Sequence, residues 1–143
     1  MSTHCLIGIK YGSTIDAIYC HYDGFLNGVG RMLVNHYNSE DLAAELIELG
    51  GISSLGEIIG QQIQPEDYQI QMVKKRSGQS NEPLQTLAYH RDRGDALVID
   101  VFNSEEDYVL RGLAGTISNI FLFDEKWKYY DRDDMEWKDI NVN

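Results

Sequence analysis

The stretch Ile18–Tyr37, IYCHYDGFLNGVGRMLVNHY, decides how the rest of the chain is interpreted. Its first residues continue a β-prone run, the pattern breaks at Asp23-Gly24, and an amphipathic helix is expected from Gly24 or Phe25 to about Tyr37. We expect Asp23 to cap this helix, because an aspartate side chain accepts hydrogen bonds from the first helical N–H groups. A strand-to-helix junction is also a natural ligand site, since those N–H groups have no partner inside the helix.

The junction carries the first set of candidate ligand-binding residues. Its N–H groups could hold a phosphate or carboxylate, although a capping Asp23 would compete with such an anion. Gly28 and Gly30 each cost a helix about 1 kcal/mol relative to alanine, so a ligand or another backbone is expected to approach them closely. Their spacing differs from the GxGxxG pattern of dinucleotide-binding folds. The candidates are His21, Tyr22, Asp23, Gly24, Asn27, Gly28 and Arg31.

A hairpin is expected to lead into the junction. The β-prone runs His4–Tyr11 and Thr14–Tyr22 are separated by Gly12-Ser13, which suits a two-residue II′ turn. Such a turn makes the two cysteines cross-strand neighbours, either as a disulfide or as reduced thiols that fill a core. The register pairs Tyr11 with Thr14, Ile7 with Ile18, Cys5 with Cys20 and His4 with His21.

The remaining chain is expected to form further helices and hairpins. One helix begins after Ser39 and ends at Gly50-Gly51, and another runs from Ser104 to about Ala114. Residues 52–82 give little indication of structure, although Tyr68–Val73 alternates as in a strand, and the acidic tail after about residue 131 is expected to fray unless Trp137 pins it. The two further hairpins are Leu84–His90 with Ala96–Phe102, and Ile117–Phe123 with Lys126–Tyr130.

These elements predict one α+β domain over residues 1–143. We expect an antiparallel sheet built from N-terminal, middle and C-terminal hairpins, with helices packed on one face.

The predicted middle hairpin presents the second set of candidate ligand-binding residues, His90, Arg91, Asp92 and Arg93. Arginine suits planar anions and stacks on nucleobases. The alternative is a solvated turn with internal Arg–Asp pairs. The letters HRD also occur in protein-kinase catalytic loops, but the Asn, the Gly-rich loop and the strand lysine of kinases are absent from this sequence.

Composition and charge exclude several classes of protein. The chain of 143 residues has a formal net charge of −11, which argues against direct nucleic-acid binding, because phosphate contacts come mainly from Lys and Arg. The acidic surface either provides solubility or imitates nucleic acid. No apolar run reaches the roughly 20 residues that span a bilayer and no secretory signal is seen, so a cytoplasmic protein is expected.

Catalytic and metal motifs are also missing from the sequence. No two of the four histidines share a recognised metal-binding spacing, and we expect His36 to lie in the core. The cysteines lack a nucleophile motif and no GxSxG is present. We therefore predict no metal, no cofactor and no catalytic residues.

Several motifs along the chain have a familiar form: Met1-Ser2-Thr3 with Leu6-Ile7-Gly8, Tyr19-Cys20-His21 with Asp23-Gly24 and Gly28-Val29-Gly30, His36-Tyr37, Ile52–Gly56, Arg91–Gly94, and Leu122-Phe123 with Trp127. Through them the chain resembles a family of small proteins of bacteriophages and prophages, which share MSTxSLIG, YCHxDGxxxGVGxxLxxHY and RDRGE motifs. This chain departs from them at His4-Cys5, at Phe25-Leu26 and at Asp95. The resemblance implies a phage accessory protein that antagonises a bacterial defence system.

On these grounds we expect a non-enzymatic protein of the host cytoplasm that sequesters a small anionic, nucleotide-like signal. Two alternatives stay open, an acidic inhibitor of a host defence protein and a small nucleotide-processing hydrolase that uses His21, Asp23 and His90. A homodimer is the assembly that such ligand-binding proteins often adopt.

Overall fold

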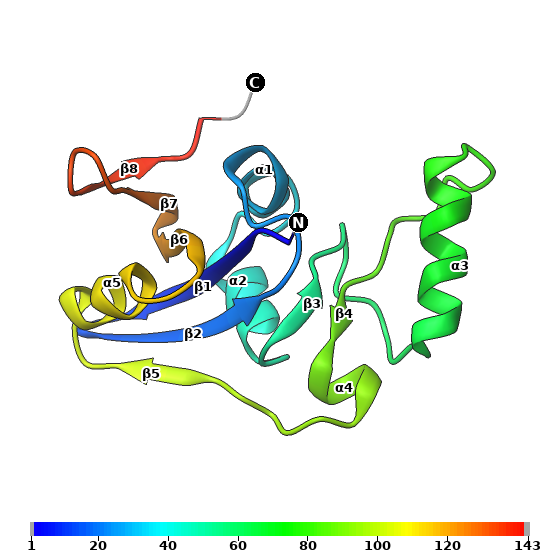
Figure 1. Cartoon of the computed structure of the whole chain (residues 1–143), viewed down its shortest axis with the longest axis horizontal. Helices are drawn as coiled ribbons and strands as arrows, with labels where there is room; N and C mark the ends of the chain where they lie inside the picture. The colour runs from blue at the N-terminus through cyan, green and yellow to red at the C-terminus, as the bar shows by residue number, and fades with distance from the viewer. Residues whose placement is uncertain (1, 142–143) are drawn as a thin grey trace.

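The computed structural model describes residues 2–141, and in them a mixed eight-stranded sheet is combined with five α-helices (Figure 1). The helices are α1 (Arg31–His36), α2 (Glu40–Ile47), α3 (Pro65–Arg76), α4 (Tyr89–Arg93) and α5 (Glu105–Leu113), and a π-helical turn η1 (Leu26–Gly30) precedes α1. The strands are β1 (His4–Tyr11), β2 (Thr14–Cys20), β3 (Ile52–Ser54), β4 (Leu87–Ala88), β5 (Asp100–Phe102), β6 (Ile117–Asp124), β7 (Lys126–Asp131) and β8 (Glu136–Asp139).

The α+β class and two of the three predicted hairpins are confirmed. β1 and β2 pair antiparallel in the predicted register, with Cys5 opposite Cys20 and Ile7 opposite Ile18. β6 and β7 form the C-terminal hairpin, in which Phe123 faces Trp127. Both cysteines are buried as free thiols.

The prediction of an antiparallel sheet is wrong, because β1 pairs parallel with β6 and β2 pairs parallel with β3. The strand order is β4-β3-β2-β1-β6-β7-β8, and β5 pairs with β2 outside that path. β1 and β6 lie at the centre and are buried on both faces, as is typical of strands covered on both sides.

The prediction of a middle hairpin is also wrong. β4 ends at Ala88, the chain turns into α4, and β5 pairs with β2 rather than with β4. The Asp92 side chain accepts a hydrogen bond from the backbone N–H of Ala88, which closes the helical turn, and Gly94 ends it with a left-handed φ of 77°. A helical turn held by the Asp92–Ala88 hydrogen bond therefore lies where the sequence predicted a hairpin turn.

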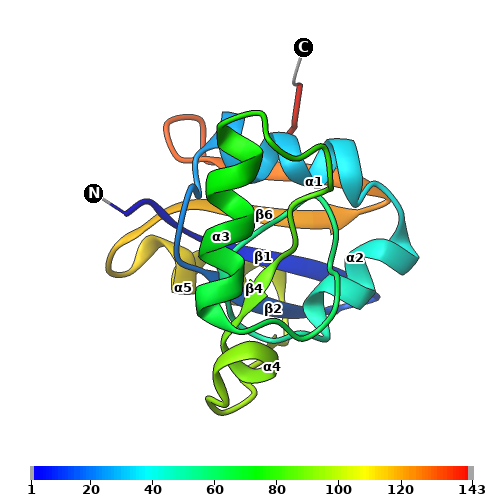
Figure 2. The same cartoon turned by 90° about the vertical axis from the view of Figure 1, so that its right-hand side faces the viewer.

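Helices cover both faces of the sheet, not one as predicted (Figure 2). On one face, Leu33 of α1 and Leu46 of α2 join the core formed with Ile7, Ile18 and Phe121. On the other face, Tyr108 of α5 lies in a second cluster whose strand residues include Leu6, Ile15, Ala17, Ile120 and Leu122.

The segment 52–82 contains a helix where the sequence indicated a strand. α3 has Pro65 in its first turn, Glu66 and Asp67 beside it, and Lys74, Lys75 and Arg76 in its last turn, an order that suits the helix dipole. Tyr68 is its only buried residue, and α3 stands beyond the β3–β4 edge of the sheet (Figures 1 and 2).

Of the two expectations for the tail, that it frays or that Trp137 pins it, the structure bears out the second as far as Asp139. Residues Glu136–Asp139 form β8 against β7, and Trp137 packs near Tyr108 and Tyr130. Ile140 is buried as well. The last two residues lie outside the described part of the chain.

Candidate ligand-binding groove

The strand-to-helix junction forms without the predicted Asp23 cap. Asp23 has a left-handed φ of 60°, and the following turn η1 has no side-chain cap. The backbone carbonyl of Asp23, rather than its carboxylate, accepts a hydrogen bond from Val29 N–H at 2.9 Å. The capping prediction is therefore wrong, because the left-handed residue turns its carbonyl toward the helix.

Backbone partners occupy two of the N–H groups at the junction. Gly24 N–H donates to the carbonyl of Thr3 at 2.8 Å, and Gly28 N–H donates to the carbonyl of Phe25 at 3.0 Å. A Cβ on Gly24 would lie 2.8 Å from the Cβ of Cys5, and a Cβ on Gly28 would meet the Asp23 carbonyl. These glycines thus allow close backbone packing. Of the two expectations, a ligand or another backbone near the glycines, the structure shows the second.

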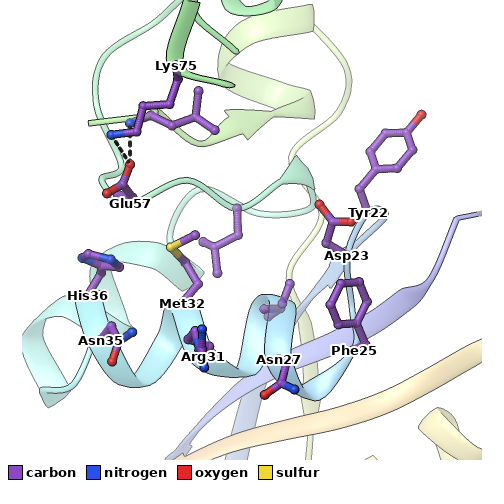
Figure 3. A pocket seen from close by; sticks show the side chains of 14 residues that line it. Tyr22, Asp23, Phe25, Asn27, Arg31, Met32, Asn35, His36, Glu57 and Lys75 are labelled. Carbon is purple, nitrogen blue, oxygen red and sulfur yellow. Dashed lines mark hydrogen bonds and ion pairs between the residues drawn. The ribbon is translucent and has the colours of Figure 1, made fainter. Parts of the chain in front are cut away.

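The candidate site is a groove between this junction and α3. Its first lobe has a volume of about 400 Å³ and is walled by η1, α1, the Leu55–Glu57 segment and the end of α3 (Figure 3). Its second lobe, of about 410 Å³, lies between β3, β4 and the middle of α3. The two lobes adjoin, and we refer to them together as the groove. Five residues line both: Tyr22, Asp23, Met32, Leu55 and Leu84.

Three cations and two carboxylates lie in the lining. Arg31, Lys75 and Arg76 are the cations, and Asp23 and Glu57 are the carboxylates. Because the chain as a whole carries a charge of −11, the groove differs in charge balance from the average surface.

Glu57 is fixed in place at the rim of the first lobe. Its carboxylate accepts a hydrogen bond from Leu84 N–H at 3.1 Å and pairs with Lys75 Nζ at 3.1 Å. These contacts, the Leu84 N–H first, lower the pKa of Glu57 from its usual value. Glu57 therefore stays ionised and links the end of α3 to the segment after β3.

Aromatic side chains line both lobes. Tyr22 and Phe25 are each 46% exposed, and they flank Asp23 at the mouth of the first lobe (Figure 3). Tyr68 lines the second lobe, where its hydroxyl donates to Ser54 Oγ at 3.0 Å and burial raises its pKa. Because Tyr68 is only 2% exposed, the ring faces open to a flat ligand are those of Phe25 in the first lobe and of Tyr22, which lines both lobes.

Only part of the first set of candidate residues lines the groove. Tyr22, Asp23, Asn27, Gly28 and Arg31 line the groove, whereas His21 and Gly24 do not. The His21 ring stacks on His4 with ring centroids 4.5 Å apart, and its Nδ1 lies 2.8 Å from the hydroxyl of Tyr19.

The second set of candidates, residues 90–93, lies outside the lining of both lobes. Arg91 donates to the Asp92 carboxylate and to the carbonyls of Ile59, Gly60 and Thr86. The Asp92 side chain is fully buried and accepts from Ala88 N–H and Ile63 N–H. Arg91 and Asp92 thus join three segments of the chain.

The outer members of that set make local contacts. The guanidinium of Arg93 lies 5.5 Å from the ring centroid of Tyr89, and His90 Nδ1 donates to the Asp95 carbonyl at 2.8 Å. The two predicted motifs therefore do not meet in one cavity.

The sequence did not indicate the lining residues of α3, nor Met32, Asn35 and His36 of α1. Lys74-Lys75-Arg76 is a basic run in the sequence, but no pattern indicated that Lys75 and Arg76 line the groove. His36 lines the first lobe and is exposed, so its assignment to the core is wrong.

No cluster of three or more His, Cys, Asp or Glu side chains suited to a metal occurs among residues 2–141. Within the same residues, no helix has the length and apolar character needed to cross a membrane. Comparison of the chain with protein-family models, with curated proteins and with solved structures gave no significant match.

Proposed function

We propose that this protein is a non-enzymatic binding protein that captures a small, anionic, nucleotide-like molecule in the groove. In a phage or prophage setting, such capture would remove a signal on which a bacterial defence system depends. The observation that carries the proposal is the presence of exposed aromatic rings and cations around one cavity of about 400 Å³.

The lining suits the parts of a nucleotide. Tyr22 and Phe25 offer ring faces to a base, and stacking of this kind contributes about 1–3 kcal/mol per base. Arg76 offers guanidinium N–H donors to a phosphate, whereas Lys75 already pairs with Glu57 and donates to the Glu82 carbonyl. The Asp23 carboxylate accepts hydrogen bonds from ribose hydroxyls or base amino groups.

One ionisable group of the lining, Glu57, is poorly suited to act as a general base. A general base works best with a pKa near the working pH, whereas the ion pair and the Leu84 N–H lower the pKa of Glu57. This supports binding without turnover.

Calorimetric titration with AMP and cyclic di-AMP tests the proposal. We expect saturable binding that Arg76→Gln weakens about tenfold, since one charge-assisted contact contributes about 1.5–3 kcal/mol. Arg93→Gln is the matched control, because Arg93 lies outside the groove. Equal losses in the two variants, or no binding at all, would contradict the assignment of the site.

Heating the complex then separates a binder from an enzyme. We expect mass spectrometry to recover the nucleotide unchanged after denaturation. Recovery of a cleaved nucleotide, at a rate that depends on protein concentration, would instead identify a hydrolase.

A further inference from the structure

We infer that the groove is built for a dinucleotide, linear or cyclic, rather than for a single nucleotide. This inference rests on the proposed function and adds the class of ligand. It comes from the way the two lobes divide the lining residues between them.

Each lobe alone is large enough for a small ligand. The volumes of about 400 and 410 Å³ both exceed the lower limit of about 300 Å³ for sites that enclose drug-sized molecules. A mononucleotide seated in one lobe would leave the other lobe unoccupied. A ligand with two base-bearing units can contact both.

Each lobe also has its own cation and an exposed ring. The first lobe holds Phe25 and Lys75, and Arg76 lines the second. Tyr22 lines both lobes and is 46% exposed, whereas Tyr68, which also lines the second lobe, is 2% exposed and has no open ring face. The lining thus provides stacking surfaces for two bases.

The cations of α3 lie along one side of both lobes. Lys75 and Arg76 are consecutive in its last turn and line different lobes, but Lys75 is already paired with Glu57 at 3.1 Å, so we assign the linking phosphate to Arg76. Asp23 lies on the opposite side, at the junction, and lines both lobes. Its carboxylate repels phosphate, which favours an orientation with the phosphate toward α3 and sugar or base groups toward Asp23.

The test compares AMP with the linear dinucleotide ApA and with cyclic di-AMP by calorimetry on the full chain. We expect at least one dinucleotide to bind about tenfold or more tightly than AMP, because a second base stacks, and to bind with one ligand per chain. The linear and cyclic probes separate the two forms of the same chemistry.

Two variants fill one lobe each with a large side chain at an exposed helical position. Asn35→Trp obstructs the first lobe and Gln69→Trp obstructs the second, and Asn103→Trp, near α5, is the matched control. Both groove variants should weaken dinucleotide binding about tenfold, whereas AMP should be sensitive to only one of them. The control should bind both like the unmodified chain.

The outcomes separate this inference from the proposed function. If AMP binds as tightly as the dinucleotides, or if two AMP molecules bind per chain, the dinucleotide inference is overturned and nucleotide capture stands. If none of the three probes binds, both are overturned.

Discussion

At the scale of single residues, Arg91 and Asp92 show how a sequence motif suited to ligand binding can serve the fold. The Asp92 carboxylate accepts four hydrogen bonds, two from Arg91 and one each from the N–H groups of Ala88 and Ile63. Removing one partner of such a buried pair leaves the other charge without compensation.

We therefore predict that Asp92→Ala lowers the free energy of unfolding by about 3–5 kcal/mol, measured by urea denaturation. Asp95→Ala is the control, because Asp95 is exposed and uses only backbone atoms in its hydrogen bonds with Tyr89 and His90. It should change the free energy by no more than about 0.5 kcal/mol. Similar values for the two variants would mean that Asp92 has no structural role.

A second residue-scale prediction concerns the stacked pair of His4 and His21. Partial burial, and then the neighbouring His4, lower the pKa of His21 from its ordinary value of 6.5. The fold thus favours neutral His21, and its contribution to stability is complete above pH 6.5 and declines as the pH falls below 6.5 toward the lowered value.

An NMR titration should place the midpoint of His21 below 6.5, and His4→Gln should raise it. The difference in unfolding free energy between the unmodified chain and His21→Gln should decrease between neutral and mildly acidic pH. A midpoint at or above 6.5 would contradict the shift.

At the scale of elements, α3 is the helix that is least anchored to the remainder of the fold. Tyr68 is its one buried residue, and its ties include the Tyr68–Ser54 hydrogen bond and the Lys75–Glu57 ion pair. We predict that Tyr68→Phe lowers stability by about 0.5–1.5 kcal/mol.

Hydrogen exchange should show where that loss occurs. Amides of α3 should exchange faster in Tyr68→Phe while those of β1 and β6 are unchanged, because local opening is confined to the weakly packed element. Tyr11→Phe provides a control at an exposed tyrosine. Equal acceleration in α3 and β1 would show that α3 opens only with the whole fold.

The elements that the sequence predicted correctly are those specified by short-range chemistry. Gly12-Ser13 fixes the first hairpin, and Ser39 and Ser104 cap α2 and α5 as expected. The parallel pairing of β1 with β6 brings Ile7 opposite Phe121, residues so distant in the chain that no local pattern indicates their contact. Local signals likewise indicated the junction residues of the groove. The α3 residues were not predicted, because only tertiary packing brings α3 next to the junction.

At the scale of the whole molecule, the net charge opposes the approach of an anionic ligand, whereas the cations of the groove favour its final binding. The chain carries −11, while Arg31, Lys75 and Arg76 line the groove. Within a Debye length of the surface but before contact, the net charge of the chain repels an anion, whereas at contact the nearby cations attract it.

We therefore predict that the association rate of cyclic di-AMP increases with salt, measured by stopped flow. Raising the ionic strength from about 0.01 M to about 0.1 M shortens the Debye length from about 30 Å to about 10 Å, which screens the long-range repulsion. The dissociation rate should increase as well, because the same ions weaken the contacts in the groove. Arg76→Gln should mainly increase the dissociation rate, since local contacts act after encounter. An association rate that falls with salt would mean that the cations of the groove govern the field at a distance, despite the acidic remainder of the chain.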